Sequence, residues 1–230
     1  MTWHPDIPLE YRNQIVTGDA RELAKRIPDE SIDLILTDPP YPKDYLYLWG
    51  ELGKMAARVL KPTGFLLAMS GQMYLNEVMV YLNSHLDYFW LYEAGSSGWA
   101  AGVCWPNGNT KVNIVVRCKP VLAYRVNETM LPRTSTLGLF WGSGGDKRFH
   151  KWGQDVSTFR YYADCFSSPG NVVLDPFAGG GTIPIACNVI NRNYIAFEID
   201  PETADLARER VLNTQPPLFV PEPEQLELGE

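Results

Sequence analysis

Apolar strand-type runs alternate with helical patterns along most of the chain, and this alternation restricts the fold more than any other feature. Short runs rich in apolar and β-branched residues predict strands, and the apolar period of the segments between them predicts helices. The predicted strands cover 14–16, 32–37, 64–70, 88–93, 112–117, 171–174 and 194–199. The predicted helices cover 20–27, 44–60, 72–84, 155–166, 181–191 and 202–213. This order predicts an α/β fold with a mostly parallel sheet and helices on both of its faces.

Two segments interrupt the alternation, and a third ends it. Residues 95–109 and 134–146 are rich in Gly and Ser, which predicts loops. The tail 215–230 is rich in Pro and Glu, and we expect it to be disordered. Residues 1–214 then form a single domain, long enough to bury a substantial core.

The net charge of the 230-residue chain is −7, which by itself argues against a nucleic-acid partner. The charge is unevenly distributed, however. Residues 107–160 hold nine Lys and Arg against three Asp and Glu, a local charge of +6, so the remainder sums to −13. The basic middle segment is either a solvated face or a surface for a polyanion.

The sequence shows no sign of a membrane or secretory protein. No window of about 18 uninterrupted apolar residues occurs, and the N-terminus lacks a basic segment followed by an apolar one. The four cysteines (Cys104, Cys118, Cys165 and Cys187) form no C-x-x-C pair, which favours reduced thiols over disulfides or a zinc site. We therefore expect a cytoplasmic protein without a metal.

The segment 171–182 (NVVLDPFAGGGT) places an acid and a glycine-rich turn between a predicted strand and a predicted helix. At the carboxyl end of a strand, such a turn builds a nucleotide-type pocket, because glycine lets the backbone approach a ligand closely. The segment does not match G-x-G-x-x-G, so a dinucleotide is the weaker ligand. Glu198 ends the next strand, where an acid suits ribose hydroxyls. The alternative is a turn needed only for packing, with Asp175 and Glu198 as ordinary strand-end acids.

Residues 37–41 (TDPPY) form a second motif at the end of a predicted strand. Pro39 and Pro40 fix the backbone and remove two N–H groups, so this corner presents the Asp38 carboxylate, the Pro39 carbonyl and the Tyr41 ring around one point. Two acceptors and a stacking surface suit the amino group of a planar base. Accepting both amino hydrogens would localise the nitrogen lone pair toward a methyl donor. A plain D-P-P turn with Tyr41 in the core is the alternative.

Together the two motifs resemble those of the DNA methyltransferases that methylate amino groups with S-adenosylmethionine. That family combines D-P-P-Y for the target amino group with D-P-F-x-G-x-G-T for the cofactor. The catalytic motif comes first here, which is similar to the circularly permuted beta class. The resemblance is strong over 14–41 and 150–212, and it implies a Rossmann-like methyltransferase fold.

The resemblance also implies a role for each matching residue. The catalytic residues would be Asp38, Pro39, Pro40 and Tyr41. The cofactor-binding residues would be Asp19 at the adenine, Asp175 and Phe177 at the methionine end, Glu198 at the ribose, and Gly179, Gly181 and Thr182 in the turn. Before the cofactor strand the family carries a His-Pro-x-x-Lys-Pro-like segment. This chain has FHKWGQ at 149–154, which leaves the role of His150 to Gln154 open.

Residues 118–149 lie where family members of this motif order place target recognition, so we predict a small recognition insertion there. Its candidate nucleic-acid contacts are Arg125, Arg133, Lys147 and Arg148, with Trp141 or Phe149 available for stacking. Phosphate contacts are favoured over base contacts, because most protein–DNA hydrogen bonds go to the backbone. Surface charge is the alternative for each residue. An insertion of this size predicts a short or relaxed target sequence.

The predicted reaction is methyl transfer to N6 of an adenine that is flipped out of duplex DNA. The Asp of D-P-P-Y favours adenine over cytosine by family tendency, so a cytosine-N4 methyltransferase stays open. RNA adenine is a further alternative, as is a non-catalytic nucleic-acid-binding module. The sequence leaves undecided whether the protein is a monomer or a homodimer and whether a restriction enzyme accompanies it.

Overall fold

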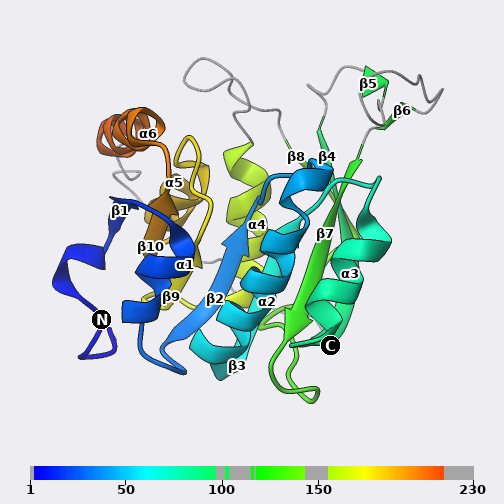
Figure 1. Cartoon of the computed structure of the whole chain (residues 1–230), viewed down its shortest axis with the longest axis horizontal. Helices are drawn as coiled ribbons and strands as arrows, with labels where there is room; N and C mark the ends of the chain where they lie inside the picture. The colour runs from blue at the N-terminus through cyan, green and yellow to red at the C-terminus, as the bar shows by residue number, and fades with distance from the viewer. Residues whose placement is uncertain (1–2, 97–101, 104–114, 117, 143–154, 215–230) are drawn as a thin grey trace, which may run out of the picture.

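The computed structural model describes residues 3–96, 102–103, 115–116, 118–142 and 155–214 (Figure 1). Its main-sheet strands are β1 (Gln14–Thr17), β2 (Ile32–Thr37), β3 (Leu60–Met69), β4 (Asp87–Ser96), β7 (Cys118–Arg125), β8 (Leu139–Gly142), β9 (Val172–Asp175) and β10 (Asn193–Glu198). The short strands β5 (Gly102–Val103) and β6 (Val115–Val116) pair with each other. The helices are α1 (Ala20–Leu23), α2 (Tyr47–Val59), α3 (Leu75–Asn83), α4 (Val156–Phe166), α5 (Thr182–Val189) and α6 (Pro201–Asn213). Single 3-10 turns cover Leu9–Tyr11, Ala24–Arg26 and Lys43–Tyr45.

Within the described residues, the main sheet has the strand order β1-β10-β9-β2-β3-β7-β4-β8. The first five strands in this order, β1 to β3, are all parallel to one another. β7 runs antiparallel to both β3 and β4, and β8 pairs parallel with β4. The predicted α/β fold with a mostly parallel sheet is confirmed. In chain order the strand that carries the D-P-P-Y motif, β2, comes well before β9, which carries the glycine turn.

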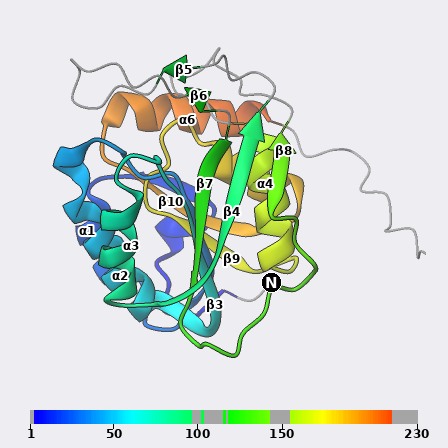
Figure 2. The same ribbon diagram turned by 90° about the vertical axis from the view of Figure 1, so that its right-hand side faces the viewer.

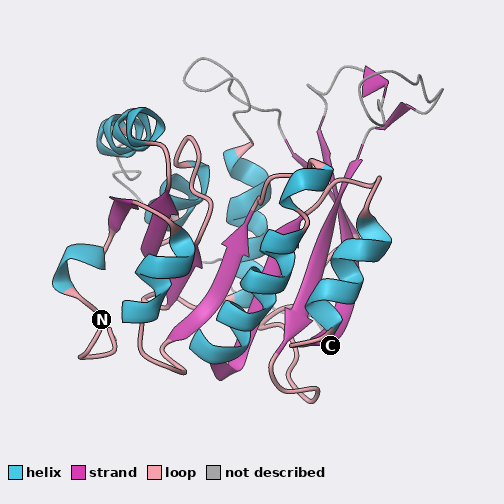
Figure 3. Cartoon of the chain, viewed as in Figure 1, coloured by secondary structure: helices cyan, strands magenta, loops and turns pink. Residues whose placement is uncertain are grey.

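Helices cover both faces of this sheet and enclose a separate core on each (Figures 2 and 3). On one face Trp49 of α2 packs in the same core as Ile35 of β2. On the other face Phe159 of α4 and Ile183 of α5 share a core with Leu34 of β2. Successive side chains of a strand point to opposite faces, so β2 contributes to both cores, and five of its six residues are buried.

The structure corrects the prediction for 118–149 at its two strands. Residues 118–125 form β7, which lies between β3 and β4, and 139–142, predicted as part of a loop, form the edge strand β8 beside β4. The strand pattern of β7 was hidden by Lys119 and Pro120, since proline is rare in central strands. Residues 126–138 connect β7 to β8, and a role of 118–149 in target recognition stays a prediction.

Two further sequence-based expectations concern membrane-spanning helices and the cysteine thiols. No helix in the described ranges is long and apolar enough to cross a membrane. Cys118, Cys165 and Cys187 are free thiols, and the last two are buried. Cys104, the segment 149–154 and the tail 215–230 lie outside the described residues.

Candidate active site

The carboxyl ends of β1, β10, β9 and β2 meet at one edge of the sheet, because these strands are parallel neighbours. A cavity of about 1190 Å³ opens at this edge. Its lining contains the whole predicted catalytic corner, residues 38–41. Of the predicted cofactor residues it contains Asp19, Asp175, Phe177, Gly179, Thr182 and Glu198. The structure therefore brings the two motifs into one cavity, although more than 130 residues separate them in the sequence.

The catalytic corner begins where β2 ends. Asp38 follows the buried Thr37, and the two prolines hold the chain so that the Tyr41 ring turns back toward Asp38. The Tyr41 hydroxyl donates a hydrogen bond to Asp38 Oδ1. Burial and the facing carboxylate together raise the pKa of Tyr41, so the phenol remains a donor at neutral pH. Asp38 is thus a partly buried acceptor, and its side chain is 18% exposed.

A hydrogen bond joins the catalytic corner to the cofactor turn. Thr37 Oγ1 donates to Asp175 Oδ1 over 2.8 Å, and both side chains are buried. The pairing of β2 with β9 places these two residues at adjacent strand ends. The two motifs therefore share one rigid wall of the cavity, which fixes the distance between their functional groups.

Asp175 is the buried acid of the cofactor turn. Its Oδ1 also accepts from the backbone N–H of Phe177, at 3.2 Å. Its Oδ2 has no hydrogen-bond partner among the described residues, although the side chain is buried. Desolvation raises the pKa of Asp175 to about 7. An unpartnered buried carboxylate oxygen on a cavity wall suits a cationic ligand group such as an ammonium.

The glycine turn between β9 and α5 needs backbone conformations that favour glycine. Gly179 has φ +47° and Gly181 has φ +74°. A Cβ at Gly179 would meet no atom within 4 Å, whereas a Cβ at Gly181 would lie 3.2 Å from the Ala207 carbonyl of α6. Gly179 therefore leaves one side of the turn open to a ligand. Gly181, which does not line the cavity, lets α5 pack against α6.

Glu198 and Asp19 follow the neighbouring strands β10 and β1. Glu198 Oε2 accepts from the Gly179 N–H at 2.8 Å, and Oε1 accepts from the Asp200 N–H at 3.0 Å. Asp19 Oδ1 accepts from the Arg21 N–H at 2.9 Å and caps α1. The Arg21 guanidinium hydrogen-bonds to the same carboxylate and holds the pKa of Asp19 below its usual range. Both carboxylates line the cavity and retain acceptor capacity.

Arg210 of α6 supports the glycine turn from behind. It is 7% exposed, and its Nη1 donates to the Gly180 carbonyl at 2.7 Å and to Thr182 Oγ1 at 3.1 Å. Replacing Arg210 by methionine keeps the aliphatic volume and removes both bonds. We expect thermal unfolding to show a loss of about 1–3 kcal/mol and calorimetry to show weaker cofactor binding. Arg208→Met on the same helix is the control, because Arg208 bonds Ile15 and Asp205 away from the turn. Equal cofactor affinities in the two variants would contradict a supporting role for Arg210.

Lys119 is a site residue that the sequence analysis missed. It lies on β7, lines the cavity, and has its Nζ 3.7 Å from Asp38 Oδ2. The sequence analysis ended a predicted strand at residue 117 and assigned 118–149 to an insertion, so it placed Lys119 outside the sheet. Ser70, which ends β3, also lines the cavity and donates its N–H to the Pro120 carbonyl.

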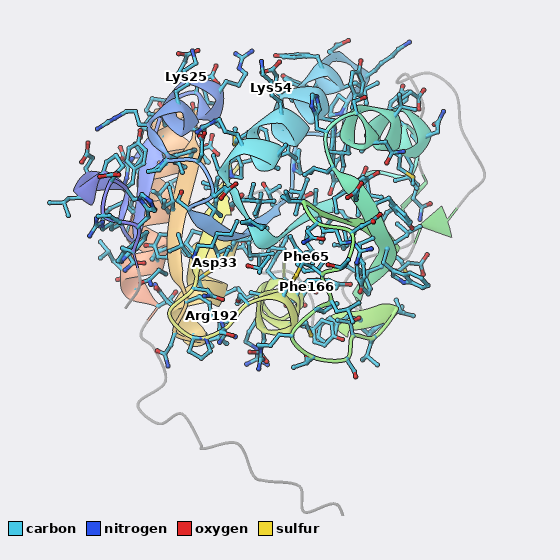
Figure 4. All side chains as sticks on the ribbon, turned by 90° about the horizontal axis from the view of Figure 1, so that it is seen from below. Lys25, Asp33, Lys54, Phe65, Phe166 and Arg192 are labelled. Atoms are coloured by element: carbon cyan, nitrogen blue, oxygen red, sulfur yellow. The ribbon has the colours of Figure 1, made fainter. Side chains whose placement is uncertain are left out.

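The structure does not bring Arg125 and Arg133 to this cavity. Arg125 pairs across the sheet with Phe65 in the middle of β3, and its guanidinium donates to the Met130 carbonyl and lies over the Phe89 ring. Arg133 donates to the carbonyl and carboxylate of Asp164 near the end of α4. Figure 4 views this opposite end of the sheet, where Phe65, Phe166 and Arg192 gather. Neither arginine lines the cavity, and their contact with nucleic acid stays a prediction. Lys147, Arg148 and Phe149 lie outside the described residues, and Trp141 lies on β8 against Gly95.

Comparisons with known proteins agree with this site. The model of the family of N6 and N4 methylases, described as DNA methylase, matches residues 142–209. The type II methyltransferase M.HpaI of Haemophilus parainfluenzae is 24% identical, over 86% of this chain and 74% of its own. M.BglII of Bacillus subtilis is also 24% identical, over 91% of this chain and 71% of its own. The regions that M.HpaI and M.BglII match each include most of the described fold.

The fold is also similar to that of a solved methyltransferase. The cytosine-N4-specific PvuII DNA methyltransferase superimposes with a TM-score of 0.73 at 17% identity, covering 88% of this chain and 93% of that chain. The D-P-P-Y corner, the glycine turn and the cavity between them lie on this shared architecture. The family match over 142–209 and the relatives at 24% identity together support an amino-methyltransferase of the N6-adenine/N4-cytosine family.

Proposed function

We propose that this protein is a DNA methyltransferase that transfers a methyl group from S-adenosylmethionine to N6 of a flipped-out adenine. The observation that carries the proposal is the single cavity in which Asp38 and Asp175 are tied together through Thr37. The catalytic corner offers acceptors for an amino group, and the cofactor turn offers the Asp175 Oδ2 oxygen, which has no partner among the described residues, for an ammonium. The relatives' designation as type II methyltransferases supports DNA as the substrate and a place in restriction and modification.

The described residues fit S-adenosylmethionine. Asp175 Oδ2 would accept from its ammonium group, and the open side of the turn at Gly179 would let its methionine end approach the backbone. Glu198 and Asp19 would accept from the ribose and the adenine, and Phe177 and Thr182 would line the same wall. When bound, the cofactor supplies a methyl group on a sulfonium centre, so no metal or covalent enzyme intermediate is required.

Asp38 and Tyr41 act on the target base. The exocyclic amino group is a poor nucleophile because its lone pair is delocalised into the ring. Donation of its two hydrogens to Asp38 and to the Pro39 carbonyl favours a localised lone pair, while the Tyr41 ring provides the stacking surface. The lone pair would form the new N–C bond as the bond between the methyl carbon and the sulfonium sulfur breaks. S-adenosylhomocysteine would be released, and the nitrogen would lose one proton to solvent. Orientation and fixed acceptors supply most of the acceleration.

The target base has to leave the duplex, because the amino group of a paired adenine cannot reach an acceptor at the bottom of a cavity. Unstacking costs a few kcal/mol, and stacking on Tyr41 offsets part of this cost. The 1190 Å³ volume is ample for a cofactor and one base. A non-catalytic binding module would need neither the buried acceptor Asp38 nor the unpaired oxygen of Asp175.

Cytosine N4 is the second candidate, because the acceptor set serves either amino group and the PvuII enzyme is cytosine-N4-specific. The Asp of D-P-P-Y supports adenine by family tendency only. RNA adenine would use the same acceptors, and no described residue is assigned to a 2′-hydroxyl.

One experiment identifies the methylated base. Expression in a host that lacks DNA methylation, followed by sequencing of the genome for modified bases, should yield N6-methyladenine at one short sequence. N4-methylcytosine instead would replace the adenine assignment and leave the mechanism intact. An unmodified genome, with the protein shown to be folded and to bind the cofactor, would argue against DNA as the substrate. Methylation of the host's RNA should then be measured.

A further inference from the structure

The antiparallel direction of β7 brings Lys119 to the edge of the sheet that carries the active site. Arg125, the last residue of β7, pairs with Phe65 in the middle of β3, and Val121 pairs with Met69 at the end of β3, so the first residues of β7 lie just beyond that end. The Pro120 carbonyl accepts from the Ser70 N–H at 2.9 Å, and Lys119 pairs with Ala94 of β4. Because β7 is paired on both sides, the Lys119 backbone is fixed near the catalytic corner.

The Lys119 side chain contacts the catalytic corner at two points. Its Nζ lies 3.7 Å from Asp38 Oδ2 and 4.9 Å from the centroid of the Tyr41 ring. The side chains of Lys119 and Asp38 are 22% and 18% exposed. At this burial an ion pair is weakly screened by salt, and an ammonium above an aromatic face is further stabilised. The Tyr41 hydroxyl on Oδ1 and the Lys119 ammonium beside Oδ2 together enclose the carboxylate.

The negative charges near Asp38 disfavour its ionised form, and a nearby cation would favour it. Asp175 of β9 faces Asp38 across the Thr37 bond and interacts with it unfavourably, and Glu198 of β10 adds a further negative charge to Asp175. Tyr41 is a neutral donor. Burial lowers the pKa of Lys119, and the Asp38 carboxylate opposes this effect. Asp175 and Glu198 are acids and Tyr41 is neutral, whereas Lys119 supplies a positive charge that favours an ionised Asp38.

We propose that Lys119 is a positioning residue that holds Asp38 ionised and oriented, so that Asp38 accepts from the amino group of the target base. A protonated Asp38 would present a hydroxyl donor on one oxygen and would lose acceptor capacity toward the amino hydrogens. The role rests on the proposed function, since the amino group is the ligand that Asp38 receives.

The direct test is a titration that needs no DNA. In the full-length protein labelled with ¹³C at the carboxyl carbon of aspartate, the Asp38 signal is assigned by its loss in Asp38→Ala and followed against pH. We expect the midpoint of Asp38 to move up by about 1–2 pH units in Lys119→Met. Lys119→Arg should return it close to the wild-type midpoint, because the charge is kept. A midpoint that Lys119→Met leaves unchanged would overturn the proposal.

Lys61→Met is the matched control. Lys61 Nζ lies 2.6 Å from Asp33 Oδ1, at the opposite end of the same sheet, and the two side chains are 31% and 13% exposed. Both pairs therefore join a half-buried lysine to an acid in or just after β2. Lys61→Met should cost stability and leave the Asp38 midpoint unmoved. A shift equal to that of Lys119→Met would mean that the effect is a general loss of packing, and it would also overturn the proposal.

A rate measurement then separates this inference from the proposed function. Transfer of a radiolabelled methyl group to genomic DNA from a methylation-free host, at saturating cofactor, gives the pH profile of kcat. Lys119→Met should move the acid limb of this profile to higher pH, and Lys119→Arg should restore it. If the wild type transfers no methyl group to DNA, the proposed function fails, while the carboxyl titration still decides the role of Lys119. If the wild type is active and Lys119→Met has an unmoved acid limb, the positioning role is wrong.

Discussion

Replacing Asp38 by alanine should lower methyl transfer by about 10³-fold or more while leaving cofactor affinity close to that of the wild type. The variant removes the carboxylate that accepts the amino hydrogens, and a fixed acceptor or donor at a reacting group typically contributes a factor of this size. The cofactor wall keeps its contacts, because Asp175 bonds Thr37 and Phe177 and not Asp38. Label incorporation into unmethylated genomic DNA and calorimetric cofactor titration measure the two quantities separately.

The Asp38→Ala variant removes the carboxylate beside the Lys119 ammonium, and the loss of one partner of a largely buried ion pair lowers stability. The double variant Asp38→Ala, Lys119→Met removes both charges, so it should be more stable than the single variant and equally inactive. Cofactor binding in either variant shows that the cavity is intact. Activity within tenfold of the wild type in a folded Asp38→Ala protein would refute the proposed mechanism.

The parts of the fold that the sequence predicted are those with a strong local signal. The run IDLILT at 32–37 has apolar residues on both faces of the strand and is followed by two prolines after Asp38. Both the strand and its end were therefore predictable. The capping acids Asp19, Asp155 and Asp200 begin helices at or within two residues of the predicted positions. β8 was missed because Gly and Ser around it outweigh its three apolar residues, and its pairing with β4 depends on distant chain segments.

The candidate site likewise combines residues that could be predicted from the sequence with contacts that could not. The motif residues around Asp38 and Asp175 were predictable, because each motif is contiguous and lies at the end of a strong strand. The Thr37–Asp175 bond and the Lys119–Asp38 pair were not, since each joins residues that only the strand order brings together. The position of Arg125 in the sheet was not predictable for a related reason. Composition reveals a basic segment, but the direction of β7 decides which end of the sheet each charge occupies.

Replacing Asp175 by asparagine should weaken cofactor binding by roughly 2–5 kcal/mol, about 30-fold or more, because the ligand ammonium then loses its buried charged partner. The amide nearly conserves volume, and it can still accept from Thr37 and Phe177 through its oxygen. Calorimetric titration with S-adenosylmethionine measures the loss. Asp33→Asn, at the opposite end of the sheet, is the control, because it weakens bonds to Lys61 and Val172 without touching the cavity.

The same substitution should stabilise the ligand-free protein, and this effect depends on pH. The pKa of Asp175 is raised from 3.8 to about 7 in the folded protein, so the folded state binds more protons than the unfolded state between these values. The free energy of unfolding of the wild type therefore falls as the pH rises from about 4 through 7, and this loss is absent from Asp175→Asn. Urea unfolding should find the variant more stable than the wild type by about 1 kcal/mol or more at pH 8, with a smaller difference at pH 5. Saturating cofactor should reverse the order at pH 8, because its ammonium compensates the carboxylate only in the wild type. A variant that is less stable at pH 8 and binds the cofactor as tightly as the wild type would show that Asp175 is a structural acid, held for its bond to Thr37 and not for a ligand.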